Sequence, residues 1–465
     1  MEQANELERL ALRNNRTGQG LIVTNLALLA LGVVMVHSAV ASVASPGRWY
    51  ARVDVRHTIF AALAAMVLLT AWRFDYTHLA TSFDELWRAA IRRLRPGRRA
   101  SSRTPRRRSL LSRAVRAAGG RCPFAAGAAL LVALLLGAIV LVPGLGWAKG
   151  GYLRWIRLGP REYSIGFQPS ELIKLSLVVF LAAWLSRESV NVRSFRQAFL
   201  PAVLLTGLCV GLVVTQDLGM GAIIGLSAAV TLLLAGVPLY YLLSLLPLAA
   251  GAFYLFVMRC PHRWLRIQAM IDPWSPDNPC AYQARQSLLA IITGGWRGKG
   301  VGGGMLKLGF LPEDSTDFIF SVFCEEWGFV GALLLMGLVV MWMWHARRAA
   351  TRAGDRFGSL LAGSLGFVIA VQAVTHIAVD AVAAPPTGMG MPFVSAGGTA
   401  LMLHAAAAAM IVSVTAGSAA RGRSPAAPRQ REATAIRSSP LSDSPSPVVP
   451  QTKTPRTPLP TSRRA

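Results

Sequence analysis

Long apolar runs constrain this chain more than any other feature of its sequence. Of its 465 residues, 53% are hydrophobic and 15% are charged, a balance too apolar for an ordinary soluble enzyme of this size. The apolar residues gather into about ten runs, each close to the roughly 20 residues that a membrane-spanning helix needs. The sequence therefore predicts an all-α integral membrane protein with about ten transmembrane helices.

Polar and basic stretches border the predicted membrane domain, which we expect to cover residues 20–416. We expect a cytoplasmic N-terminus at residues 1–19 and no cleavable signal peptide, because the first apolar run is long enough to remain as an anchor. Residues 77–121 are predicted to form a basic cytoplasmic insertion, and residues 417–465 a disordered basic cytoplasmic tail. The large segment at residues 258–317, between the seventh and eighth predicted helices, is the expected extracytoplasmic catalytic loop.

The net charge of +26 comes from arginines in the loops. With ten helices and a cytoplasmic N-terminus, the basic groups near Arg92, Arg193, Arg352 and Arg437 all fall on the cytoplasmic side, as the positive-inside rule requires. This distribution predicts a multi-pass protein of a bacterial inner membrane, with membrane lipids as partners of the basic segments. Nucleic acid is not an expected partner, because the basic insertion lacks interleaved aromatic residues beyond Trp87.

The predicted external loop carries many cations on the side of the membrane where they are normally sparse. These are Arg259, Arg263, Arg266, Arg285, Arg297, Lys299 and Lys307. They are either solvated residues of a long loop, which crosses the membrane largely regardless of charge, or ligands of an anion such as a lipid-linked diphosphate. The glycines of residues 294–304 fit a phosphate-cradling loop and a flexible external loop equally well.

Asp317 directly precedes the apolar run Phe318-Ile319-Phe320, at the outer mouth of the predicted eighth helix. Burial raises the pKa of a carboxyl group toward the range useful for a general base, whereas neighbouring cations lower it. The structural alternative is an N-terminal cap, in which Thr316 or Asp317 accepts hydrogen bonds from the first free amides of the helix. The two roles are compatible.

Three further ionisable residues lie near the outer ends of predicted helices. Glu171 and Lys174 are spaced i, i+3 on the fourth helix and can form an ion pair, and Asp217 lies between the fifth and sixth helices. An ionisable group at membrane depth costs roughly 2.5 to 3.5 kcal/mol, so such groups usually face a cavity and a partner. They either line a substrate cavity or lock helices together.

The five cysteines show no spacing typical of a metal site. Cys260 and Cys280 share the predicted external loop, so the sequence is compatible both with a disulfide between them and with two free thiols.

Four stretches, in order along the chain, resemble the SEDS family of cell-wall polymerases that contains RodA and FtsW. They are Arg154 with Gln168-Pro169-Ser170-Glu171 and Lys174; Asp272-Pro273-Trp274 with Tyr282-Gln283 and Gly298-Lys299-Gly300; Leu311-Pro312-Glu313 with Thr316-Asp317-Phe318; and Met391-Pro392-Phe393 with Ser395 and Gly397-Gly398. The chain departs from the family pattern at two places: Gln216 stands where a proline often precedes the acid, and Ser315 replaces a usual histidine. Thr387, in place of a lysine typical of FtsW, is a RodA-like feature.

This resemblance implies a peptidoglycan glycosyltransferase that polymerises lipid II on the outer face of the inner membrane, for elongation or division, with inversion at the anomeric carbon. It implies Asp317 as the catalytic general base, Mg²⁺ or Mn²⁺ as a cofactor, and a class B penicillin-binding protein as partner. Together with the charge pattern, it makes a set of residues candidates for substrate binding: Arg154, Glu171, Lys174, Asp217, Arg263, Arg266, Gln283, Lys299, Lys307, Glu313 and Ser395.

Two other functions are compatible with these sequence features. One is a flippase that moves lipid II without making a bond, and the other is a different polyprenyl-dependent membrane glycosyltransferase. Polymerisation of lipid II in detergent, where there is no second leaflet to reach, separates the flippase from the enzyme.

Overall fold

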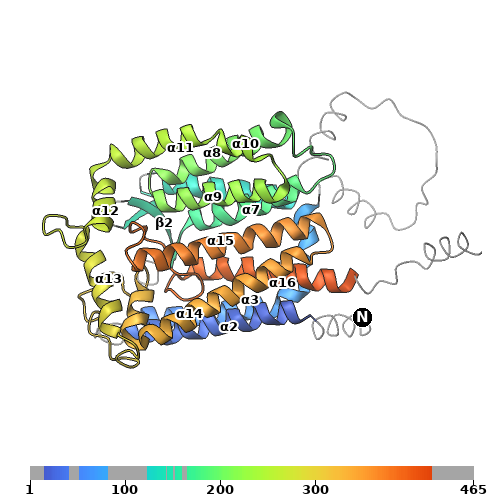
Figure 1. Ribbon diagram of the computed structural model, residues 1–465. Helices are drawn as coiled ribbons and strands as arrows, with labels where there is room; N and C mark the ends of the chain where they lie inside the picture. Colours follow the sequence, from blue (N-terminus) through green and yellow to red (C-terminus); the bar gives the residue numbers. More distant parts are fainter. Residues whose placement is uncertain are drawn as a thin grey trace, which may run out of the picture. The chain divides into compact units, whose positions relative to one another are not determined.

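The computed structural model describes residues 15–40, 52–81, 123–142, 144–149, 152–159 and 165–421. Within these residues, each predicted apolar run falls on a helical segment, which confirms the all-α membrane class (Figure 1). Eight helical segments are long and apolar enough to cross a membrane, judged by length and composition. Two others, α6 and α7, are apolar helices of 17 residues each.

The helices that carry the predicted runs follow in chain order. They are α2 (Arg16–Val40), α3 (Val53–Thr70), α6 (Phe124–Val140), α7 (Pro169–Leu185), α8 (Leu200–Val214) preceded by the π-helical η5 (Phe195–Phe199), α9 (Leu218–Ala235), the run of α10 (Leu239–Leu243), α11 (Leu246–Phe253) and η6 (Tyr254–Met258), α14 (Ile319–Thr351), α15 (Arg356–Asp380) and α16 (Thr399–Arg421).

Several predicted boundaries need correction. The segment at residues 258–317 is not a plain loop, because it contains two helices, α12 (Pro261–Ile271) and α13 (Ala281–Gly294). The tail was predicted to begin at residue 417, which is too early, since α16 continues to Arg421. Short 3₁₀ helices, η2 (Ala71–Arg73) and η3 (Tyr76–Ala80), occupy the start of the predicted insertion at residues 77–121. The rest of that insertion up to residue 122, residues 1–14 and residues 422–465 lie outside the described residues.

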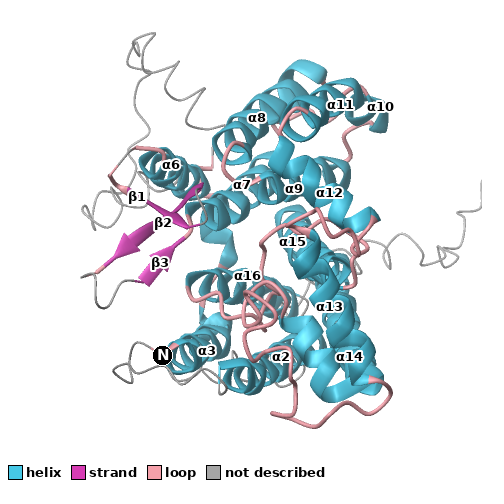
Figure 2. Cartoon of the chain, turned by 90° about the vertical axis from the view of Figure 1, so that its left-hand side faces the viewer, coloured by secondary structure: helices cyan, strands magenta, loops and turns pink. Residues whose placement is uncertain are grey.

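A small antiparallel sheet, which the sequence analysis did not predict, follows α6. Its strands are β1 (Gly146–Lys149), β2 (Tyr152–Leu158) and β3 (Ile165–Phe167), in the order β1-β2-β3. Trp147 pairs with Trp155, and Ile156 of the central strand pairs with Phe167. Figure 2 shows the strands beside α6 and α7, at the end of the helices where α12 and α13 also lie.

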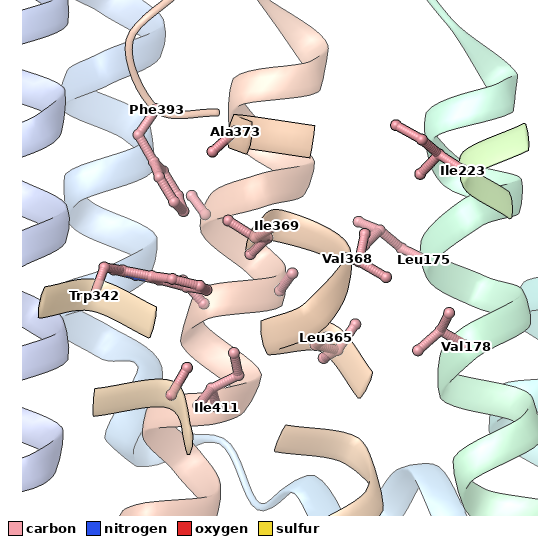
Figure 3. Close-up of a cluster of buried hydrophobic side chains, with 14 of the residues drawn as sticks. Leu175, Val178, Ile223, Trp342, Leu365, Val368, Ile369, Ala373, Phe393 and Ile411 are labelled. Carbon is pink, nitrogen blue, oxygen red and sulfur yellow. The ribbon is translucent and has the colours of Figure 1, made fainter. Parts of the chain in front are cut away.

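Helix α15 forms the centre of the apolar core. In the most apolar 18 residues of α15, 72% of the residues are buried, against 6% in the run from Leu239 to Met258. Side chains of α15, among them Leu365 and Ile369, lie between Trp342 on one side and Val178 on the other (Figure 3). Helix α15 thereby joins α7 and α9 to α14 and α16.

A glycine-rich segment, residues 294–304, packs against a kink in α14. The kink lies at Gly328, whose φ of 66° is in the left-handed region that favours glycine. A Cβ atom on Gly298 would lie 2.1 Å from the carbonyl oxygen of Glu326, so only glycine permits this approach. Backbone hydrogen bonds from Lys299 to Glu325 and from Gly300 to Glu326, both 3.0 Å, fix the contact. These glycines therefore serve helix packing in the structure.

Candidate active site

Asp317 lies in a tight turn immediately before α14. Its amide donates to the carbonyl oxygen of Glu313 at 2.9 Å, and Glu313 itself has a left-handed φ of 57°. The first turn of α14 begins after Phe318, which has no polar side chain to act as a cap. The capping alternative predicted for Asp317 and Thr316 is therefore not the arrangement at the N-cap position of this helix.

Ser395 fixes the turn from the other side. Its hydroxyl donates to the carbonyl oxygen of Thr316 at 2.7 Å and accepts from the amide of Met391 at 2.7 Å. A neighbouring backbone bond, from Ala396 to the oxygen of Ser315 at 3.0 Å, runs parallel to it. Ser395, which the sequence suggested as a substrate ligand, is thus placed to hold the residue next to Asp317.

Gly388 brings a cation and the candidate base together. A Cβ atom on this residue would lie 3.5 Å from Nη1 of Arg154 and 3.6 Å from Oδ2 of Asp317. Its φ of 70° is again one that glycine favours. The Arg154 guanidinium and the Asp317 carboxylate therefore both lie beside the same residue, although they come from distant parts of the chain.

Arg154 projects from β2 toward the start of α9. Its Nη1 lies 3.3 Å from Oδ2 of Asp217, and its Nε donates to the carbonyl oxygen of Gln216 at 2.9 Å. The other Asp217 oxygen accepts from the amide of Met220 at 3.0 Å and so caps α9. Burial raises the pKa of Asp217, and the nearby charge of Arg154 opposes that rise.

Two predicted diphosphate ligands on α12 contact backbone carbonyls. Arg263 donates to the oxygens of Val214 and Thr215, at 3.1 and 2.8 Å. Arg266 donates to the oxygen of Pro386 at 3.2 Å. The two arginines connect α12 with the loops that carry Asp217 and Gly388. Their side chains therefore hold these loops in place at the border of the site.

The two predicted lysine ligands form ion pairs with consecutive residues of α14. Lys299 lies 2.6 Å from Glu325, and Lys307 lies 2.7 Å from Glu326 and 2.9 Å from the hydroxyl of Ser38 on α2. Lys307 is only 3% exposed. Removing one partner of a buried pair typically costs about 3 to 5 kcal/mol, because the other charge is left uncompensated. Lys299 anchors the glycine-rich segment to α14, and Lys307 anchors the residues that follow it.

The predicted ion pair between Glu171 and Lys174 is present, with 2.6 Å between its charged atoms. It extends into a buried network, since the Lys174 ammonium also donates to Gln372 of α15 and the ring of His404 contacts the same amide. Gln372 in turn donates to the carbonyl oxygen of Gly390 at 3.0 Å. The pair thus supports the loop after α15.

The remaining predicted ligands lie on the same outer elements. Glu313 accepts a hydrogen bond from the hydroxyl of Thr316 at 2.9 Å, and Gln283 lies half-buried on α13. Cys260 and Cys280 are both free thiols. Within the described parts of the chain, no group of three or more His, Cys, Asp or Glu side chains is arranged to hold a metal ion.

A small hollow of about 30 Å³, open to its surroundings, adjoins Arg154 and Asp217. Its walls are mainly apolar and come from α6, α7 and α8, whereas Arg154, Gln216 and Asp217 form its polar end. An apolar pocket with a few convergent polar groups is the usual form of a small-molecule or lipid site. This arrangement suits a ligand with an apolar chain and an anionic head.

Three residues of the site were not predicted from the sequence: Gln372 and Asp380 toward the C-terminal end of α15, and Gly388 in the loop that follows. Asp380 ends a long apolar run, and a charged residue in that position is a signal for a functional or structural partner. Gly388 and Gln372 gave no comparable signal, because their importance depends on contacts with remote segments.

The sequence model of the FtsW, RodA and SpoVE family, described as cell cycle proteins, matches residues 124–419. The chain belongs to this family. It is the SEDS family that the sequence motifs indicated.

Several relatives extend the comparison. The probable peptidoglycan glycosyltransferase FtsW of Saccharophagus degradans is 35% identical over 293 residues, which cover 62% of this chain and 74% of the relative. Stage V sporulation protein E of Bacillus subtilis is 33% identical over 287 residues, covering 62% and 77%. The FtsW of Trichlorobacter lovleyi is 30% identical over 403 residues, covering 85% and 92%.

Solved structures share the fold. The rod shape determining protein RodA of Thermus thermophilus matches with a TM-score of 0.53 at 23% identity, covering 85% of this chain and 95% of that one. A peptidoglycan synthase complex that coordinates polymerization and crosslinking contains a chain with a TM-score of 0.62 at 23% identity, covering 86% and 98%. These likenesses confirm the helical membrane architecture.

The turn before Asp317 gives a testable pH dependence. Burial raises the pKa of Asp314 from 3.8 to about 6, so the folded protein binds this proton more tightly than the unfolded chain. Stability is therefore lost as the pH rises from about 4 to about 6. We expect Asp314→Asn to raise the thermal unfolding midpoint above pH 6 by about 1 to 3 °C. The gain should shrink toward pH 4, and a gain of equal size at both pH values would contradict this explanation.

Proposed function

We infer that this chain is a peptidoglycan glycosyltransferase that polymerises lipid II, with Asp317 as the general base. Its family membership and its FtsW relatives support the reaction class. The observation that carries the residue assignment is the meeting of the Asp317 carboxylate and the Arg154 guanidinium beside Gly388. A base and a cation at one place are what transfer of a sugar from a diphosphate requires.

In the proposed reaction, Asp317 takes the proton from the 4-hydroxyl of the terminal N-acetylglucosamine on lipid II. The oxygen then attacks the anomeric carbon of the growing glycan, and the bond from that carbon to the lipid diphosphate breaks. The diphosphate leaves with the bonding electrons, and attack from the opposite face gives an inverted, β-1,4 linkage. Arg154 is the cation placed closest to this chemistry, because it lies beside the same glycine as Asp317.

The pocket next to Arg154 supports a lipid-linked substrate. Its apolar walls from α6, α7 and α8 would take part of an isoprenoid chain, and the polar end at Arg154 would face the diphosphate. Arg154 already balances Asp217 at 3.3 Å. Arrival of a diphosphate would add a second anion to a cation that is only partly exposed, so binding should depend on ionic strength.

Dependence on Mg²⁺ or Mn²⁺ is also part of this proposal. The described residues do not form a metal site by themselves, so no step of the mechanism is assigned to the ion. The diphosphate oxygens of the substrate would have to supply much of its coordination shell, as is usual for Mg²⁺ on phosphate substrates.

Crosslinking of the product would need a partner, and a class B penicillin-binding protein fits that role. The similar chain in the synthase complex, which coordinates polymerization and crosslinking, supports this pairing. The active site would face the outer side of the inner membrane, since the arginine-rich loops are expected in the cytoplasm.

Cysteine labelling tests this orientation. In a variant whose native cysteines are replaced by serine, single cysteines at Ser101 and at the exposed Asp277 are treated with an impermeant thiol reagent on intact cells. We expect labelling of the residue 277 variant alone until the cells are opened. Labelling of both from the outside would contradict the proposed orientation.

The reaction itself is tested with purified protein and fluorescent lipid II in detergent, with and without the partner. We expect a ladder of glycan products on a gel, loss of the ladder when EDTA is added, and its return with Mg²⁺ or Mn²⁺. Other polyprenyl-linked sugars should give no ladder. Absence of a ladder from lipid II under every condition, together with transport of lipid II in vesicles, would favour a flippase instead.

A further inference from the structure

Helix α14 starts immediately after the candidate base but lacks a capping side chain at its own N-terminus. An α-helix leaves its first four amide groups without partners inside the helix, and a side chain at the N-cap position usually accepts one of them. In α14 that position is Phe318, whose side chain cannot accept a hydrogen bond. The amide of Ser321, in the first turn, donates to the carbonyl oxygen of Phe318 at 3.1 Å, and a side-chain acceptor for it can come only from elsewhere in the fold.

Asp380, the last residue of α15, provides that acceptor. Its Oδ2 accepts from the amide of Ser321 at 3.0 Å, and the residue is fully buried. A carboxylate at the N-terminus of a helix also interacts favourably with the helix dipole. Asp380 interacts electrostatically with Asp317 as well, so the two carboxyl groups share one neighbourhood.

His376 extends the cap to the loop that contains Gly388. It lies one turn earlier on α15, with Nε2 at 3.6 Å from Oδ2 of Asp380 and Nδ1 at 2.9 Å from the carbonyl oxygen of Met389. A carbonyl can only accept, so Nδ1 must carry a hydrogen and Nε2 faces the carboxyl group. Asp380 and His376 are thus in electrostatic contact, and together they hold residues on both sides of the site.

Ser287 of α13 completes this buried cluster. Its hydroxyl donates to the backbone oxygen of Asp380 at 2.6 Å and lies 2.5 Å from the hydroxyl of Ser321. The start of α14, the end of α15 and α13 are thus joined at one point. A displacement of Asp380 would be transmitted to the turn that holds Asp317 and to the loop that holds Gly388.

We propose that Asp380, supported by His376, is a positioning residue for Asp317. Asp380 caps α14 from a different helix and His376 clamps the loop at Met389, so the pair sets the distance between Asp317 and the surface formed by Gly388 and Arg154. As a statement about catalysis this rests on the proposed function, and as a statement about structure it can be measured without any activity.

The test compares Asp380→Ala with Asp380→Asn in the purified full-length protein. Alanine removes the side-chain acceptor of the Ser321 amide and leaves only its 3.1 Å bond to the carbonyl oxygen of Phe318. Asparagine keeps an acceptor oxygen in that place without the charge. Because misplacement of a reacting group by about 1 Å can cost about 100-fold in rate, we expect alanine to lower kcat for lipid II polymerisation by about 10- to 100-fold. KM should change by less than about threefold, and asparagine should restore kcat to within about threefold of the parent.

Asp355→Ala is the matched control. Asp355 caps the opposite end of α15, where it accepts from the amide of Gly358 at 3.1 Å and from the hydroxyl of Tyr76. Its loss should lower thermal stability but leave kcat per folded molecule unchanged. Hydrogen exchange gives the readout that is independent of activity: Asp380→Ala should speed exchange at residues 319–323 and 387–391, and Asp355→Ala should leave those amides as they are.

Unchanged exchange at residues 319–323 in Asp380→Ala would overturn the proposal even if the parent protein has no polymerase activity. An equal loss of kcat in the alanine and asparagine variants would overturn it as well. Activity would then depend on the charge of Asp380 and not on its role as hydrogen-bond acceptor for α14. A fall in kcat of similar size in Asp355→Ala would show a general effect of instability. A parent without polymerisation, combined with the expected exchange pattern, would count against the proposed function alone.

Discussion

Desolvation of charged groups is the constraint on which the end of this protein that carries the candidate site depends. Buried carboxylates and cations cost several kcal/mol each unless they are paired. Glu325 and Glu326, both almost fully buried, therefore hold Lys299 and Lys307. These pairs attach the glycine-rich segment to the kinked start of α14. Arg154 and Asp217 join the sheet to α9 by the same principle.

The cations around the candidate site fall into two groups, according to what they contact. The lysines and the α12 arginines have partners within the protein, either carboxylates or backbone carbonyls, and they shape the walls of the site. Arg154 is paired as well, with Asp217 and the carbonyl oxygen of Gln216, but it lies beside both Gly388 and the apolar pocket, where we propose that it meets the substrate. Four of the seven basic residues of the segment at residues 258–317 thus serve as a scaffold for the proposed site.

Local patterns of sequence predicted much of this structure, whereas contacts between distant residues were out of reach. Apolar runs located the helices, and the i, i+3 spacing of Glu171 and Lys174 predicted their ion pair. The roles of Ser395 and Asp380 depend on partners 79 and 59 positions away, which no periodicity reveals. The three-stranded sheet was missed because its strands are only 3 to 7 residues long. Lys299 and Lys307 were predicted to bind a ligand because their partners, Glu325 and Glu326, lie in a different element, the predicted eighth helix.

The most direct measurement of the central claim is the activity of Asp317→Asn in the lipid II polymerisation assay. The amide is nearly isosteric and keeps an acceptor oxygen, yet it cannot take a proton at neutral pH. General-base catalysis contributes about 100- to 10,000-fold, so a folded, membrane-inserted variant should give no visible glycan ladder. A ladder close to that of the parent protein would contradict the account and move the catalytic assignment to Glu313 or Asp314.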